Sequence, residues 1–171
     1  DDFVRPPAGM LVTCGDGSDP DENVWLLNIH VVFGKSASAR NAELEAAADA
    51  IEAYLGCKVD PSNPGSCSSS GTWSANAAIM GGDWNRSKSR IEKFLCDNIS
   101  STYYCEVFLD DKTSINRTTG NWSSPYDHFV SVYKSVDPMP TGASRIPESE
   151  YGAASRQDYV DDISDHIGVS N

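Results

Sequence analysis

The chain has 171 residues, 39% of them hydrophobic, which suits one domain with a core of its own. Its formal net charge is −12. This negative charge counts against a protein that coats nucleic acid passively, because such binding depends on lysine and arginine. An acidic net charge is also common simply on well-solvated surfaces. It does not count against a protein whose bound metal ion supplies the positive charge. No apolar run approaches the ~20 residues of a membrane span.

The residue pattern of the first part of the chain predicts a loop, then a strand, then a helix. Residues 14–23 are rich in Gly and Asp and indicate a loop. Residues 24–33 form a nearly continuous apolar run, as in a strand buried on both faces. A helix follows, which we expect Ser38 to cap and Gly56 to end. Its apolar residues recur at helical spacing, namely Leu44, Ala48, Ile51 and Leu55.

The second part alternates in the same way. Residues 57–74 form a Ser-, Gly- and Pro-rich loop that leads to a short strand at 77–81. Ser87 is expected to cap a second helix. Two further strands are expected at residues 103–109 and 129–133. Residues 110–125 between them are turn-rich, and residues 135–160 are largely irregular. Alternating strands and helices indicate layered structure, either α/β or α+β.

Four polar motifs end an apolar run or precede one, and they contain every histidine of the chain. In chain order they are Asn28-Ile29-His30, Gly82-Asp83-Trp84-Asn85, Tyr126-Asp127-His128-Phe129-Val130 and Ser164-Asp165-His166. The two-residue spacing of Asp83 and Asn85 places both side chains on one face of an extended segment. A carboxylate and an amide oxygen there suit a hard cation such as Mg²⁺. The alternative is an Asx turn that follows the strand.

This ordered set resembles the endonuclease/exonuclease/phosphatase superfamily, the deoxyribonuclease I-like metal phosphodiesterases, from about residue 24 to residue 169. The resemblance implies an α+β fold, a two-sheet β-sandwich with outer helices. Residues 1–171 would form the C-terminal portion, roughly two thirds, of one such domain. The family's upstream half carries metal-binding Glu residues, and nothing before His30 corresponds to it. The resemblance therefore implies an N-terminal part that is missing here and is supplied by another chain or lost from a cleaved precursor.

The resemblance also implies roles for single residues. Asp83 is expected to bind the metal and help activate water, and Asn85 to contact the metal or the scissile phosphate. His30 and His166 are expected to act as general acid or base and to stabilise the transition state. For His30, a satisfied core histidine is the alternative.

Three further residues complete the expected site. Asp127 would orient the imidazole of His166, and Asp165 would lie on the metal side. Arg86 follows the Gly-Asp-x-Asn motif, and in the branch that includes the cytolethal distending toxin nuclease subunit an Arg here contacts phosphate. The alternative for Arg86 is a surface residue at a helix N-terminus. His128 is more typical of a strand edge than of a catalyst.

The five cysteines show neither a CxxC pattern nor zinc-finger spacing. Cys57 and Cys67 flank a loop with Pro and Gly, and Cys96 and Cys105 flank a second local loop, so we predict two disulfides. Cys14 is left over, either for a bond to another chain or as a buried free thiol.

Glycosylation sequons begin at Asn98, Asn116 and Asn121. Together with the paired cysteines they favour a secreted glycoprotein. A fourth sequon, at Asn85, falls within the expected active site, and we expect it to be unmodified because a glycan there would block the cleft.

The sequence therefore predicts a secreted, divalent-metal-dependent phosphodiesterase, above all a DNA endonuclease using Mg²⁺, with Ca²⁺ or Mn²⁺ as alternatives. Two other functions remain open. One is a sphingomyelinase-like lipid phosphodiesterase, which shares the core motifs, and the other is a catalytically inactive extracellular binding or scaffold module. We also expect a tightly associated N-terminal partner, with Cys14 as one route of covalent attachment.

Overall fold

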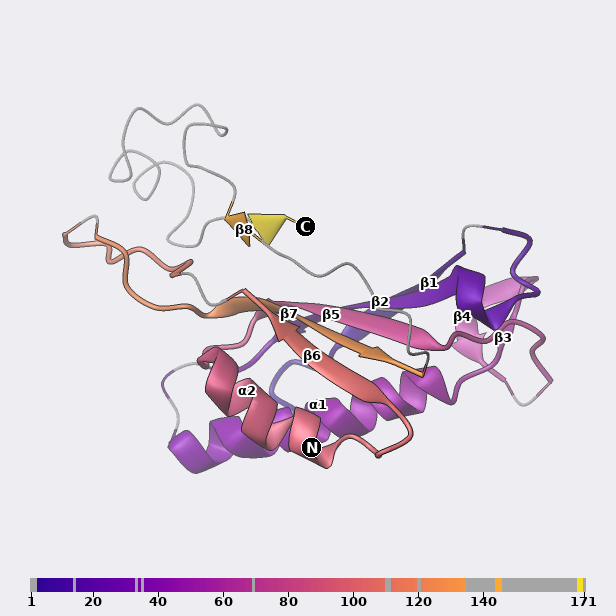
Figure 1. Cartoon of the computed structure of the whole chain (residues 1–171), viewed down its shortest axis with the longest axis horizontal. Helices are drawn as coiled ribbons and strands as arrows, with labels where there is room; N and C mark the ends of the chain where they lie inside the picture. Colours follow the sequence, from indigo (N-terminus) through magenta and orange to yellow (C-terminus); the bar gives the residue numbers. More distant parts are fainter. Residues whose placement is uncertain are drawn as a thin grey trace.

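A five-stranded sheet with strand order β1-β2-β5-β7-β6 forms the centre of the computed structural model (Figure 1). The structure describes residues 3–13, 15–32, 34, 36–68, 70–109, 112–119, 121–134, 144–145 and 169–170. The strands of the sheet are β1 Ala8–Thr13, β2 Asn23–His30, β5 Ala77–Asp83, β6 Tyr104–Phe108 and β7 Asp127–Tyr133. β2 and β5 run parallel, and the other neighbouring pairs are antiparallel.

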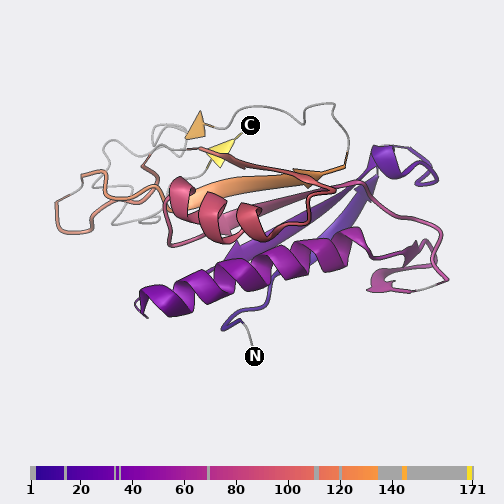
Figure 2. The same cartoon turned by 60° about the horizontal axis from the view of Figure 1, so that its bottom comes forward.

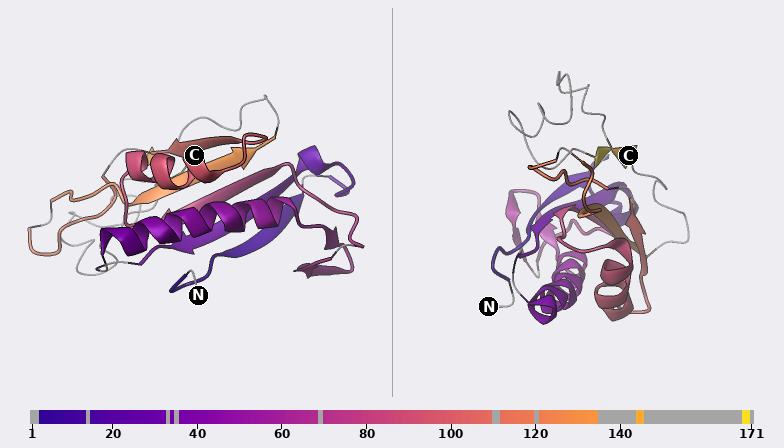
Figure 3. Two further views of the ribbon diagram at one scale, coloured as in Figure 1. Left: turned by 90° about the horizontal axis from the view of Figure 1, so that it is seen from below. Right: turned by 90° about the vertical axis from the view of Figure 1, so that its left-hand side faces the viewer.

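Two α-helices cover one face of this sheet, as the views from below and from the end show (Figures 2 and 3). α1, Ala37–Leu55, joins β2 to its parallel neighbour β5, and α2, Lys88–Phe94, follows β5. The hydroxyl of Ser36, not of Ser38, caps α1 by accepting a hydrogen bond from the Ala39 amide at 3.2 Å. The predicted cap was therefore two residues too late, whereas the predicted end at Gly56 is confirmed.

The smaller elements lie outside the central sheet. Two 3₁₀ helices span Pro20–Glu22 and Cys96–Asn98. β3, Val59–Asp60, pairs with β4, Asn63–Cys67, inside the segment that the sequence indicated as a loop. β8, Ser144–Arg145, pairs with β9, Val169–Ser170.

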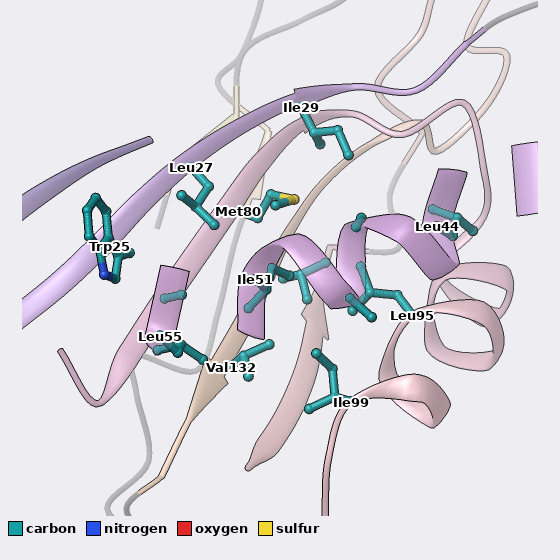
Figure 4. Packing of buried hydrophobic residues seen from close by; sticks show 14 of the residues in the cluster. Trp25, Leu27, Ile29, Leu44, Ile51, Leu55, Met80, Leu95, Ile99 and Val132 are labelled. Carbon is teal, nitrogen blue, oxygen red and sulfur yellow. The ribbon is translucent and has the colours of Figure 1, made fainter. Parts of the chain in front are cut away.

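The hydrophobic core fills the space between the sheet and the helices (Figure 4). The sheet contributes inward-facing residues of β2, β5 and β7, and α1 contributes the apolar face that its sequence predicted. The members labelled in the figure are Trp25, Leu27, Ile29, Leu44, Ile51, Leu55, Met80, Leu95, Ile99 and Val132. Burial of this one-sided layer removes apolar surface from water and so stabilises the helices against the sheet.

β2 is buried on one face only, which contradicts the expectation of a strand covered on both sides. Its residues alternate between buried and exposed from Trp25 onward, and Leu26 is 41% exposed. Its partner on β1, Met10, is 61% exposed on the same side of the sheet. An apolar run does not by itself distinguish one covered face from two, and here the described helices cover one.

The α+β class is confirmed, since the described residues form one mixed sheet with helices on one face. A second large sheet is not among the described elements, so the two-sheet sandwich stays a prediction. Within the described ranges, no helix combines the length and apolar composition needed to cross a bilayer.

Both predicted disulfides are present. Cys57 is bonded to Cys67 and Cys96 to Cys105, with Cα–Cα distances of 5.3 and 5.4 Å. The first ties the end of α1 to β4, and the second ties the segment after α2 to β6. Cys14, the predicted unpaired cysteine, lies outside the described residues.

Candidate active site

Three of the predicted site residues lie in one row across three adjacent strands. His30 ends β2, Asp83 ends β5 and Asp127 begins β7. The strand register pairs His30 with Asp83, and Asp83 with Asp127. Directly paired residues point to the same side of a sheet, and His30 alternates with the buried Ile29, so this row faces away from the helices.

His30 and Asp83 approach each other closely. The Nε2 atom of His30 lies 3.7 Å from the Oδ2 atom of Asp83, an ion-pair distance rather than a short hydrogen bond. The His30 side chain is 46% exposed and that of Asp83 16%. His30 is therefore not a core histidine, which was the alternative, and its ring is accessible to solvent beside a carboxylate.

A glycine allows the two strands to meet at this edge. Gly82 has φ +148°, and a Cβ atom added there would lie 1.9 Å from the carbonyl oxygen of Ile29. Only glycine accommodates both this backbone conformation and this approach. The glycine of the Gly-Asp-x-Asn motif thus places Asp83 directly beside His30.

The turn after β5 draws Asn85 into the protein. The Asp83 Oδ1 atom accepts the Asn85 backbone N–H at 2.9 Å, so the Asx turn considered from the sequence is present. Asn85 has φ +48°, is 6% exposed, and donates from Nδ2 to the Val31 carbonyl at 2.7 Å. The Val31 amide in turn donates to the Asp83 carbonyl at 2.9 Å. Asn85 therefore joins the end of β5 to the residue that follows His30.

Arg86 contacts α1. Its guanidinium donates to the Ala37 carbonyl at 2.5 Å and to the Asn41 side chain at 2.7 Å. Partial burial lowers the pKa of Arg86, and the charges of Arg40 and Arg90 lower it further. Contact of Arg86 with phosphate stays a prediction.

His128 supports the site from inside the core. It is fully buried on β7, between β5 and β6, and so does not lie at the edge that its sequence position suggested. Its Nδ1 atom is 2.7 Å from the Leu109 carbonyl, and its Nε2 atom is 2.6 Å from the Pro125 carbonyl and 3.0 Å from the Arg86 carbonyl. The His128 ring thus joins the segments that follow β5 and β6 to the residue that lies two positions before Asp127.

Two positioning side chains were missed by the sequence analysis. Thr113 is buried, and its hydroxyl oxygen accepts the backbone N–H groups of Tyr126 at 3.2 Å and Asp127 at 2.9 Å. Glu43 is a buried carboxylate on α1 that accepts two backbone N–H groups. The only available sequence signal was for Glu43, a charged residue next to the apolar stripe of the helix.

The expected metal site is incomplete in the described part of the chain. Asp165 and His166 lie outside the described residues, so the orienting role of Asp127 toward His166 stays a prediction. Among the described side chains, no three His, Cys, Asp or Glu residues are grouped so that they hold a metal ion. Binding of a metal by Asp83, Asn85 and Asp165 therefore stays a prediction.

Three of the four sequons lie at the surface. All three asparagines are exposed; Asn98 ends a 3₁₀ helix, and Asn116 and Asn121 lie outside the helices and strands. Asn85 is buried and its Nδ2 atom is hydrogen-bonded, so the folded chain does not present it for glycosylation.

No model of a protein family matches the sequence, and no curated protein matches it. Among solved structures, the chain is similar to a crystal structure of D. rerio TDP2 humanized by 14 mutations, with 11% sequence identity and a TM-score of 0.46. The similarity covers 86% of this chain and 53% of that one, so the chain spans about half the length of the structure it matches. A likeness this low supports no conclusion about chemistry, which has to come from the residues themselves.

Proposed function

We propose that the chain carries the catalytic edge of a secreted, divalent-metal-dependent phosphodiesterase that hydrolyses DNA. One observation carries the proposal, namely that His30, Asp83 and Asp127 lie side by side at one end of three adjacent strands. The motifs that contain them are far apart in the sequence, and folding of the sheet brings them together.

The row offers the groups that phosphodiester hydrolysis needs. The reaction requires activation of water, a positive charge against the phosphoryl oxygens and a proton for the leaving oxygen. The accessible His30 ring can accept or donate a proton at Nε2, and this atom lies 3.7 Å from the Asp83 carboxylate. Asp127 is the register partner of Asp83, so a second carboxylate residue lies at the same end of the sheet.

The proposed metal ion is Mg²⁺, held by the Asp83 carboxylate and by Asp165, with Asn85 as the amide ligand of the metal or phosphate. A bound cation would supply the positive charge against the phosphoryl oxygens. The Nδ2 atom of Asn85 is a donor and binds the Val31 carbonyl, so the ligand of a cation would be the Oδ1 atom.

Secretion and the substrate are also part of the proposal. The two disulfides and the exposed sequons support an oxidising, extracytoplasmic location. The choice of DNA rests on the resemblance at Arg86, whose described contacts are with α1.

We further propose that another polypeptide segment covers the open side of the sheet and completes the site. The exposed apolar residues Met10, Val12 and Leu26 lie on the same face as the row of His30, Asp83 and Asp127. Contiguous apolar surface of this kind is typical of an interaction site. Sedimentation together with copurification tests this point, and a stable isolated monomer with sharp thermal unfolding would contradict it.

The function is tested by nicking of supercoiled plasmid with Mg²⁺, with Ca²⁺ and with EDTA. We expect EDTA-sensitive nicking that Asp83→Asn and His30→Gln each reduce by a factor on the order of 10² or more. Asp60→Asn is a matched control, because Asp60 also ends a strand and also accepts the backbone N–H two residues later, at 2.8 Å.

Two outcomes would contradict the proposal. If Asp83→Asn nicked plasmid at the wild-type rate, the assignment of Asp83 to the active site would be wrong. If EDTA did not affect nicking, the proposed metal dependence would be wrong. Hydrolysis of sphingomyelin without nicking of DNA would keep the site and change the substrate to a lipid.

A further inference from the structure

A buried carboxylate of α1 reaches the loop that follows His30. Glu43 is 5% exposed, although its neighbours on the buried face of the helix are Leu44, Ala47 and Ala48. Burial of a charge is costly unless the charge is paired or hydrogen-bonded. Both oxygens of Glu43 are hydrogen-bonded, Oε1 to the Val4 amide at 3.0 Å and Oε2 to the Val32 amide at 2.7 Å.

The second of these bonds is connected to the candidate site through two residues. Val32 follows Val31, whose amide donates to the Asp83 carbonyl and whose carbonyl accepts the Asn85 side chain. The segment after His30 is thus held from two directions, by Glu43 on the helix side and by the Asp83–Asn85 turn on the strand side. Loss of the Glu43 carboxylate leaves the Val32 amide without this acceptor, so one side of this support is removed.

We propose that Glu43 is a positioning residue of the candidate active site. Its carboxylate fixes the backbone after His30 and thereby sets the His30 ring against Asp83 and the Asn85 side chain against the end of β5. This inference rests on the proposed function for its catalytic consequence, whereas its geometric content is independent of any activity.

A carboxylate suits this position better than any other side chain. Two backbone N–H donors converge on it, and an ionised carboxylate presents two acceptor oxygens. In Glu43→Gln one of the two donors would face an NH₂ group, so one bond is retained and one is lost. In Glu43→Leu, which has a similar volume, both bonds are lost.

α1 offers a matched control at its other end. The Glu52 carboxylate accepts the Ser100 backbone N–H, which is also a bond from the helix to a remote loop. Ser100 belongs to the segment after α2 and not to the row of His30, Asp83 and Asp127. Glu52→Leu therefore removes a comparable bond without touching the loop after His30.

The experiment uses the full chain, together with any copurifying chain. Nicking of supercoiled plasmid at saturating Mg²⁺ gives kcat and KM, and an NMR spectrum at one fixed pH gives the ring signals of His30 and the side-chain amide signals of Asn85. We expect Glu43→Leu to lower kcat roughly 10- to 100-fold with KM changed less than about 2-fold, as for supporting partners of other catalytic sites. Glu43→Gln should fall between wild type and Glu43→Leu, and Glu52→Leu should match wild type.

The NMR signals separate this inference from the proposed function. If wild type hydrolyses no phosphodiester, the proposed function fails, but displacement of the His30 and Asn85 signals in Glu43→Leu and not in Glu52→Leu would still support the positioning role. Unmoved His30 and Asn85 signals in Glu43→Leu overturn it. Equal losses of kcat in Glu43→Leu and Glu52→Leu also overturn it, since both would then act through general stability. If Glu43→Leu does not fold, Glu43→Gln and its signals decide between the same results.

Discussion

Replacement of Gly82 by alanine should destabilise the protein far more than replacement of another glycine with positive φ. At φ +148° the added Cβ atom would lie 1.9 Å from the Ile29 carbonyl oxygen. The neighbouring atom belongs to the backbone of β2, so no side-chain rotation relieves the contact. β2 and β5 would have to separate at the Ile29–Gly82 pair.

The expected loss follows from two contributions. A non-glycine residue in this region of backbone conformation costs about 1–3 kcal/mol. Separation of the strands also weakens ladder hydrogen bonds next to Asp83, at about 1 kcal/mol each, so loss of about two of them adds about 2 kcal/mol. Together these give about 3–5 kcal/mol, a large share of the ~5–15 kcal/mol that stabilises an ordinary domain.

Gly34→Ala is the matched control. Gly34 has φ +78°, and an added Cβ atom would meet nothing within 4 Å. Its substitution carries only the backbone cost of positive φ, about 1–2 kcal/mol. The two variants therefore differ in the contact with β2 and share the unfavourable backbone conformation.

The assay is urea unfolding with both disulfides intact, followed by tryptophan fluorescence. Trp84 is fully buried two residues after Gly82 and reports on this edge of the sheet. We expect the free energy of unfolding to fall for both variants, by at least ~1 kcal/mol more for Gly82→Ala. Equal losses would refute the view that close approach of β5 to β2 requires this glycine.

Three further predictions concern the support of the site, the surface and the response to pH. Thr113→Val should lower the free energy of unfolding by about 1–3 kcal/mol, because two backbone N–H groups at the start of β7 lose their acceptor. The control Thr102→Val, at an exposed threonine, should lower it little, and chemical denaturation measures both variants. Peptide mapping of protein from a secreting eukaryotic host should show glycans at surface sequons and none at Asn85, and an Asn85 glycan would contradict its burial. Burial and the neighbouring Glu106 raise the pKa of Tyr133 above its ordinary 10.0, so the unfolded chain loses this proton first and stability falls as pH rises above about 10. Tyr133→Phe should reduce that fall in an unfolding series across the alkaline range.

The row of site residues was predictable from the sequence because the local pattern contains it. A polar residue at or near the end of an apolar run indicates where a buried strand ends. Asp83 follows such a run and ends β5, and His30 ends β2 although its apolar run continues to residue 33. The pairing of those ends is a property of the sheet, and it is given by the register of β2 with β5. Residue spacing alone does not specify which strands become neighbours.

The errors have physical reasons of the same kind. β1 was missed because its stability comes from antiparallel pairing with β2, a contact between separate segments. The prediction that β2 is buried on both faces was wrong, because an apolar run indicates hydrophobic residues but not how many of their faces are covered. Leu26 of β2 is exposed. The cap of α1 was placed late because Ser36 and Ser38 both suit a cap, and the observed choice depends on the Ala39 amide.

The supporting residues were harder to predict than the row itself, and this difference follows from the kind of partner they have. Glu43 and Thr113 bind backbone N–H groups, which every residue except proline offers, so their partners leave no trace in the sequence. What the sequence does show is a charged residue in a position where burial is expected, such as the carboxylate next to the apolar stripe of α1. The hydrogen-bond partners that would offset the cost of burying this charge are not visible in the sequence. A charged residue in such a place must be hydrogen-bonded in the fold or else destabilise it. Here one of the two Glu43 oxygens reaches the loop after His30, so the search for that compensation leads to the candidate active site.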